Sequence, residues 1–131
     1  QQRTKTTNRY FNYIYVRMGA HTLIHKRTED DIWKNLFELP LVETEKDLSE
    51  EEFLACPQFH ALFAEGEVRM VRTLLRGVKH VLSHRVIYTN FYEVTLPDNS
   101  SSFSSYQRVA VEDLDRYAVP RLIHAFLEKY V

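Results

Sequence analysis

Apolar side chains occupy both faces of the run at residues 85–96, and this pattern limits the possible folds more than any other feature. Alternate residues of a strand point to opposite sides, so Val86 and Tyr88 share one face of this run. Ile87 and Phe91 fall on the other face. A strand that is apolar on both faces needs cover on both sides. The sequence therefore predicts a layered domain with a central sheet.

Two runs rich in aromatic and β-branched residues open the chain and are typical of strands. They cover residues 10–17 and 22–27 and are separated by Gly19-Ala20, so we expect a hairpin here. Further strands are expected at residues 68–75, 78–82 and 106–110.

The segment from Ser49 to Glu52 is typical of a helix start. The Ser49 hydroxyl can accept from the third helical amide, and the Glu52 carboxylate can reach back to the Ser49 amide. Pro57 interrupts this helix, and we expect it in the first turn of a second helix that stops at Gly66. A last helix is expected over residues 120–130. These elements together predict an α+β fold, an α/β/α sandwich with a mixed sheet.

Length and composition exclude several protein classes. A chain of 131 residues is expected to form one domain. No apolar run approaches the roughly 20 residues that span a membrane, so no membrane partner is expected. The single cysteine, Cys56, cannot form an internal disulfide or hold an iron–sulfur cluster by four thiolates, and a reducing cytosol is the default. The net charge of −1 argues against a strong general DNA binder but permits one basic face.

Charged residues are segregated along the chain. Residues 1–27 carry six cations and no anion, whereas residues 29–52 carry ten anions and two cations. No carboxylate occurs from Val68 to Tyr92, and this window holds Ser83-His84 between two extended runs. Such a pair is often only a polar turn. Among cations, however, it can offer a hydroxyl to a base edge while phosphate is held, which predicts a reader of nucleic acid.

Four segments carry a resemblance to a known family. The hairpin that ends at Lys26-Arg27 is followed by the segment from Ile32 to Pro40, by the segment from His80 to His84, and by the segment from Val119 to Ile123. In this order they resemble the C-terminal domain of the MutY-type adenine DNA glycosylases, a Nudix-like domain similar to MutT. The resemblance implies that residues 9–131 form an 8-oxoguanine-recognition domain and that residues 1–8 are a remnant of an interdomain linker.

The family's Phe-Ser-His loop lies against the oxidised base, and the resemblance places Leu82, Ser83 and His84 there as lesion-recognition residues, with an aliphatic residue in the first position. Oxidation at C8 of guanine turns N7 from a hydrogen-bond acceptor into a donor, and a serine hydroxyl can accept a hydrogen bond from it. We therefore expect Ser83 to read the lesion and His84 to support it. Weak contacts to the DNA backbone are expected from Arg76, Lys79 and Arg85, although the first and second could be solvated strand charges.

Catalysis is not expected from this chain. In the MutY family, a separate N-terminal domain with an essential Asp and a [4Fe-4S] cluster removes the adenine. We therefore assign no catalytic residue, metal or cofactor here, and we expect the fragment alone to be inactive although its parent would be a DNA glycosylase of base excision repair. The expected partners are duplex DNA containing 8-oxoguanine opposite adenine and the chain's own N-terminal catalytic domain. The expected location is the bacterial cytoplasm, at the nucleoid.

Two other functional classes remain open. A Nudix hydrolase of oxidised nucleoside diphosphate derivatives would carry the spacing Gly-x5-Glu-x7-Arg-Glu-x-x-Glu-Glu, which residues 37–65 do not show. Glu50, Glu51 and Glu52 are consecutive and would point in different directions on a helix, so a role at the positive helix end suits them better. A protein-interaction domain could use the acidic residues 29–52 or the loop at residues 98–105.

Overall fold

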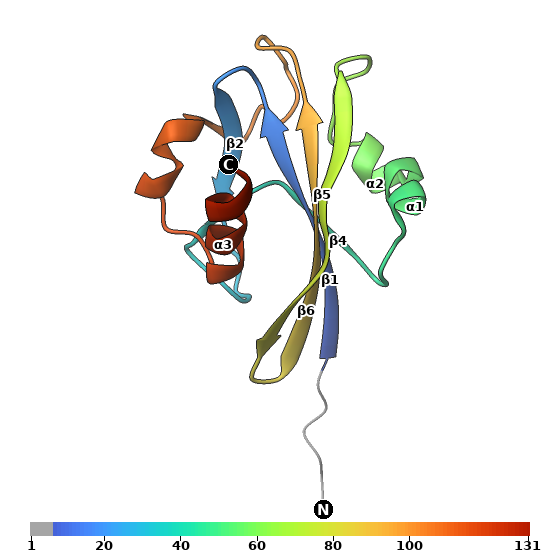
Figure 1. The fold of residues 1–131 in the computed structure, drawn as a ribbon, viewed down its shortest axis with the longest axis vertical. Helices are drawn as coiled ribbons and strands as arrows, with labels where there is room; N and C mark the ends of the chain where they lie inside the picture. The colour runs from blue at the N-terminus through green and yellow to red at the C-terminus, as the bar shows by residue number, and fades with distance from the viewer. Residues whose placement is uncertain (1–6) are drawn as a thin grey trace, which may run out of the picture.

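The computed structural model describes residues 7–131, which form two β-sheets flanked by helices (Figure 1). Within this part of the chain, no helix has the length and apolar character that crossing a bilayer requires. The elements in chain order are β1 Thr7–Arg17, β2 His21–Lys26, β3 Phe37–Glu38, β4 Leu41–Thr44, α1 Glu50–Ala55, α2 Pro57–His60, β5 Met70–Leu82, β6 Arg85–Thr95, β7 Gln107–Ala110, the 3₁₀ helix η1 Val111–Arg116 and α3 Arg121–Tyr130.

The larger sheet has the strand order β4-β1-β6-β5 and is mixed, because β1 and β6 run parallel while the other pairs are antiparallel. Helices α1 and α2 lie on one side of it, and the smaller sheet β3-β2-β7 lies with α3 on the other (Figure 1). Phe53 of α1 stacks on Tyr92 with ring centroids 4.6 Å apart, and Phe126 of α3 stacks on Phe91 at 4.1 Å. The prediction of a mixed sheet covered on both faces is confirmed.

The predicted opening hairpin is wrong in one respect. The chain does reverse between Met18 and His21, where the two residues exchange backbone hydrogen bonds of 2.9 and 3.0 Å around Gly19 at a φ of 60°. Both edges of β1 are already occupied by β4 and β6, so β2 cannot extend the pairing. It leaves the larger sheet and pairs with β3 and β7 instead.

Strand β1 also begins earlier than predicted. Thr7 and Asn8 were assigned to a linker, but they pair with Arg85 and Val86 of β6. This pairing satisfies their backbone groups, which is why the strand extends to Thr7. Residues 1–6, the rest of the predicted linker, lie outside the described part of the chain.

The two strands predicted at residues 68–75 and 78–82 form one strand, β5, with a bulge. The register against β6 shifts between Leu75 and Val78, and Gly77 adopts a φ of 70° there. Its amide donates to Oδ1 of Asn90 at 2.8 Å, so the bulged backbone is satisfied without ending the strand. The predicted helix stop at Gly66 is also wrong, because α2 ends at His60 after one turn.

Candidate nucleic-acid interface

The predicted site lies at the end of an arm that projects from the domain. The arm consists of residues 78–82 of β5, residues 85–88 of β6 and residues 7–10 of β1. It extends beyond the helices on both sides of the sheet (Figure 1). Ser83 and His84 form the two-residue turn at its tip, and both are exposed. The hydroxyl and the imidazole named from the sequence therefore lie together at an accessible end.

The backbone of the turn is held at its base. Leu82 pairs with Arg85 across the hairpin, and the Thr7 amide donates to the His84 carbonyl oxygen at 3.0 Å. The Leu82 side chain is half-buried and packs against the core cluster that contains Phe11. Leu82 thus joins the turn to the core.

The three predicted backbone cations have different surroundings. Lys79 is exposed, and no carboxylate of residues 7–131 pairs with it. Arg76 turns back toward α1, where it donates to the Tyr92 hydroxyl at 2.7 Å and to the Leu48 carbonyl at 2.9 Å. Arg85 donates to Asp31 at 3.2 Å, with its side chain 42% exposed. Lys79 and Arg85 therefore lie on the arm, and Arg76 lies at its root.

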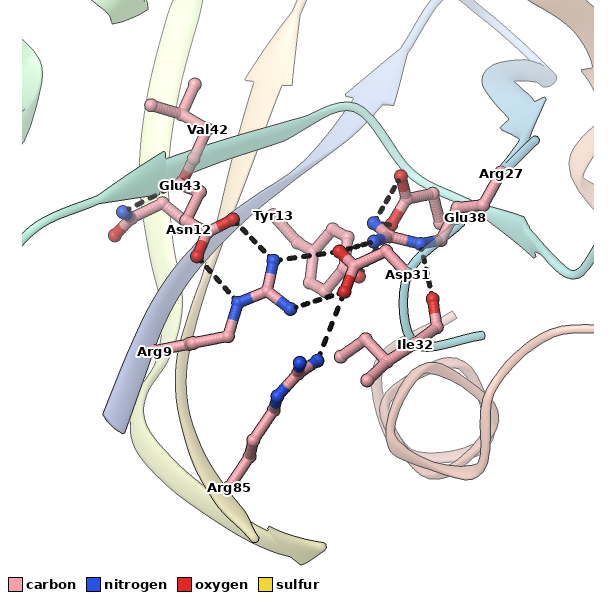
Figure 2. Close-up of polar contacts among 10 residues, drawn as sticks. All are labelled: Arg9, Asn12, Tyr13, Arg27, Asp31, Ile32, Glu38, Val42, Glu43 and Arg85. Atoms are coloured by element: carbon pink, nitrogen blue, oxygen red, sulfur yellow. Dashed lines mark hydrogen bonds and ion pairs between the residues drawn. The ribbon is translucent and has the colours of Figure 1, made fainter. Parts of the chain in front are cut away.

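A charge cluster that the sequence reasoning missed connects the arm to the loop after β2 (Figure 2). Asp31 accepts from Arg9 at 2.8 and 2.9 Å, from Arg27 at 2.8 Å and from Arg85 at 3.2 Å. Hydrogen bonding to Arg9 holds the pKa of Asp31 well below its ordinary range. Because Arg9 and Arg85 belong to the arm, this one carboxylate ties two of its three strands to the loop.

The cluster continues into the domain through buried Glu38. Its carboxylate accepts from the Tyr13 hydroxyl at 2.7 Å and from Arg27 at 3.0 and 3.1 Å, and the His25 imidazole lies 2.9 Å away. Burial and the charge of Glu38 raise the pKa of Tyr13, which stays a neutral donor. A cavity of about 320 Å³ lies beside these groups, and Tyr106 forms part of its wall.

A second carboxylate, Glu43, completes the ion pairing of Arg9. It accepts from the Arg9 guanidinium in two hydrogen bonds of 2.7 Å each, and with Asp31 it raises the pKa of Arg9. The segregation of cations in residues 1–27 from anions in residues 29–52 was the sequence signal for this cluster. Arg9 and Arg27 of the first segment pair with Asp31, Glu38 and Glu43 of the second, which the pattern alone did not reveal.

The glutamates at the start of α1 form a helix cap. The Glu52 amide donates to the Ser49 hydroxyl at 3.1 Å and the Ser49 amide donates to Glu52 at 2.9 Å, so the predicted capping box is confirmed. Glu50 accepts a hydrogen bond from the Thr73 hydroxyl. Among residues 7–131, no three Asp, Glu, His or Cys side chains converge in a way that could hold a metal ion. The donor set that a metal-dependent diphosphate hydrolase needs does not fit these residues.

Comparisons with known proteins agree with this architecture. A sequence model of the NUDIX domain matches residues 12–129. The C-terminal domain of mouse MUTYH, solved in complex with human PCNA, is similar with a TM-score of 0.66 and 15% identity, over 93% of this chain and 86% of that chain. No curated protein sequence matches the chain.

Two MutT structures are similar to the chain to a comparable degree. One comes from a study of MutT from Aliivibrio salmonicida and Vibrio cholerae, with a TM-score of 0.62, 15% identity and coverage of 94% of this chain and 96% of that one. The other, from Methanosarcina mazei, has a TM-score of 0.61, 16% identity and coverage of 95% and 93%. At such low identity these likenesses establish the fold.

Proposed function

The chain belongs to the Nudix domain family, and from this premise we propose that it recognises 8-oxoguanine opposite adenine in duplex DNA, as the lesion-reading domain of a MutY-type adenine DNA glycosylase. The observation that carries the proposal is the exposed Ser83-His84 turn at the end of a braced, projecting arm. Removal of the adenine would belong to a separate catalytic domain.

The chemistry of the tip fits the oxidised base. Guanine presents acceptors at N7 and O6 in the major groove, and oxidation at C8 places a proton on N7. The exposed Ser83 hydroxyl can accept a hydrogen bond from that N7–H group, whereas toward N7 of undamaged guanine it can only donate one. His84 lies beside it and can contact phosphate or the same base. The discrimination therefore rests on one hydrogen bond whose direction changes with oxidation.

The charges around the tip favour binding of a polyanion such as DNA. The hairpin has no carboxylate from Val68 to Tyr92, and Lys79 and Arg85 lie within a few residues of the turn. Asp31 neutralises part of the Arg85 charge, so the electrostatic attraction is modest. We expect weak binding by the isolated chain that falls steeply with salt, because phosphate contacts release counterions.

The alternative is a Nudix hydrolase, which would need oxygen ligands that converge on a metal ion. Glu52 serves the cap of α1 and Glu50 accepts from Thr73, so two of the three candidate glutamates already have partners in the protein. These partners favour a structural role for the two glutamates and support a binding role for the domain. Turnover of oxidised dGTP in the presence of magnesium would favour the hydrolase instead.

The test compares Ser83→Ala with the unmutated chain, called the parent chain below. It measures binding to two duplexes, one with 8-oxoguanine opposite adenine and one with guanine opposite adenine. Ser105→Ala is the matched control, because it removes an exposed hydroxyl from a distant loop. We expect Ser83→Ala to reduce the preference for the lesion by about five- to tenfold, the value of one hydrogen bond, and Ser105→Ala to leave it unchanged. Equal preference in all three proteins would reject the role of Ser83.

A further inference from the structure

One face of the arm carries an apolar stripe that lies outside both core clusters of the described residues. Val81 and Val86 are directly paired across the hairpin, and Tyr88 follows two residues after Val86 on the same face. Tyr10 pairs with Tyr88 from β1, and their rings stack with centroids 5.6 Å apart. We call these four residues the open face. Val81 is its most accessible member, with 66% of its surface exposed.

The open face lies beyond the cover that α1 provides. Tyr92 continues the same face of β6 into the domain, where Phe53 stacks on it. Between Tyr92 and the arm lies a polar belt in which the Asn90 amide donates to Asn12 and to Asp47 at 3.2 Å each. The four open-face residues belong to neither core cluster of the described chain, nor to the apolar residues packed against those clusters. Val81 is exposed and the other three are half-buried, so part of their apolar surface is accessible to a partner.

The opposite face of the arm is built differently. Leu82 points into the core on that side, His80 contacts Trp33 with ring centroids 5.9 Å apart, and Arg9 is held by the charge cluster. Asp31 and Glu43 pair with arginines there. On the open face, Lys79 stands directly opposite Tyr88, and no described carboxylate pairs with this lysine.

We propose that the open face is a second DNA-contact surface, on which Val81 and its neighbours pack against the sugars and bases beside the lesion while Lys79 meets a phosphate. This inference rests on the function proposed above, because Val81 lies two residues from Ser83. Ser83 follows directly on β5, so an approach that brings Ser83 to a base edge also brings Val81 and Lys79 of the same strand close to the duplex. Apolar side chains and a lysine that no described carboxylate pairs with suit that surface.

In this proposal Val81 makes the apolar contact with DNA, and Leu82 anchors the turn to the core. Neighbouring strand residues point to opposite faces, and only one of the two can meet DNA while the other holds the turn on the core. The resemblance to the Phe-Ser-His loop had suggested Leu82 as the residue against the base. Leu82 is half-buried and packs against the core cluster, whereas Val81 is exposed, and this difference transfers the contact to Val81.

The experiment compares Val81→Asn with Met70→Asn in the full chain, using the same lesion-containing and undamaged duplexes. Met70 is the matched control because it is an apolar residue of β5 that is 55% exposed but lies at the far end of the strand. We expect Val81→Asn to weaken binding to both duplexes by about tenfold, the cost of losing one buried apolar contact, with the lesion preference intact. Met70→Asn is expected to change either affinity by less than about twofold.

The outcomes separate this inference from the function on which it rests. If Val81→Asn binds like the parent chain while Ser83→Ala loses its preference, the open face is not a DNA contact and lesion reading stands. If Ser83→Ala keeps its preference, or if the parent chain binds no duplex, both proposals fall. Unfolding curves of both Asn variants that match the parent curve show that a loss of binding does not reflect a loss of fold.

Discussion

The β5–β6 hairpin has two halves that are held in place in different ways. In the half inside the domain, aromatic rings from helices stack on both faces, as Phe53 does on Tyr92 and Phe126 on Phe91. In the arm, one face is held by Leu82 and by the arginines around Asp31, and the apolar residues of the other face lie outside both core clusters of the described residues. The bulge at Gly77 lies between the two halves.

This difference indicates how a Nudix fold can present a binding tip. Where helices cover both faces of a sheet, its side chains cannot reach a partner. The hairpin becomes accessible only where it extends beyond those helices. An arm without cover would lack the apolar contacts that fix its position. The charge cluster supplies that fixation from one side only, which leaves the turn and the open face available.

The largest effect should come from the core of the packed half. Phe53→Ala removes a fully buried ring between α1 and the sheet, and we expect it to lower the free energy of unfolding by about 3–5 kcal/mol. Val81→Ala on the arm should change the same quantity by less than about 0.5 kcal/mol. Chemical denaturation measures both, and similar losses for the two variants would contradict the division into a packed half and an open arm.

A smaller effect is expected from the charge cluster. Asp31→Ala leaves Arg9, Arg27 and Arg85 without a shared acceptor and should cost about 2 kcal/mol, whereas Asp30→Ala, at an exposed neighbour, should cost less than about 0.5 kcal/mol. The pKa of Asp31 is lowered in the fold, so its contribution is present above its ordinary value near 3.8 and is lost as the pH falls below it. The two variants should therefore converge in strongly acidic solution, and a gap that persists there would show that charge is not the cause.

The next effect distinguishes the two faces of the arm. Leu82→Ala should lower the free energy of unfolding by about 1–2 kcal/mol, because the half-buried leucine side chain no longer packs against the core cluster. Val81→Ala, on the neighbouring residue, serves as its control. Hydrogen exchange at the Ser83 and His84 amides should accelerate in the Leu82 variant alone. Equal acceleration in both variants would mean that Leu82 does not anchor the turn.

The smallest effect concerns the serine-rich loop, which is remote from the arm. Glu67 accepts from the hydroxyls of Ser100 at 2.6 Å and Ser102 at 2.7 Å, and these bonds lower its pKa from 4.5 to about 2. Its hold on the loop is therefore complete above pH 4.5 and is lost as the pH falls toward about 2. Protection of the amides in residues 98–105, measured relative to the intrinsic exchange rate at each pH, should fall over that interval, and Glu67→Gln should show the lower protection already at neutral pH. Protection that is insensitive to both changes would show that Glu67 does not hold the loop.

The sequence predicted those features that depend on local pattern. Alternation in residues 85–96 predicted a sheet covered on both faces, and the residue types from Ser49 to Glu52 predicted the capping box. The position of Ser83-His84 between extended runs predicted the exposed turn. Each of these follows from residues close to one another along the chain.

Features that depend on distant partners were missed. The pairing of β1 with β6 joins residues far apart in sequence, and it is this pairing that excludes β2 from the larger sheet. Asp31 meets Arg9 and Arg85 only because three separate segments converge. The inward direction of Leu82 depends on which face of β5 meets the core, and the family resemblance did not determine that face.

The central claim is that the exposed turn of the arm senses the oxidised base. Titration of the labelled chain with duplex containing 8-oxoguanine opposite adenine, followed by the backbone amide signals, tests it most directly. The Ser83 and His84 signals should move with the lesion duplex and move far less with the guanine duplex. Signals at the turn that stay in place while another surface responds would contradict it.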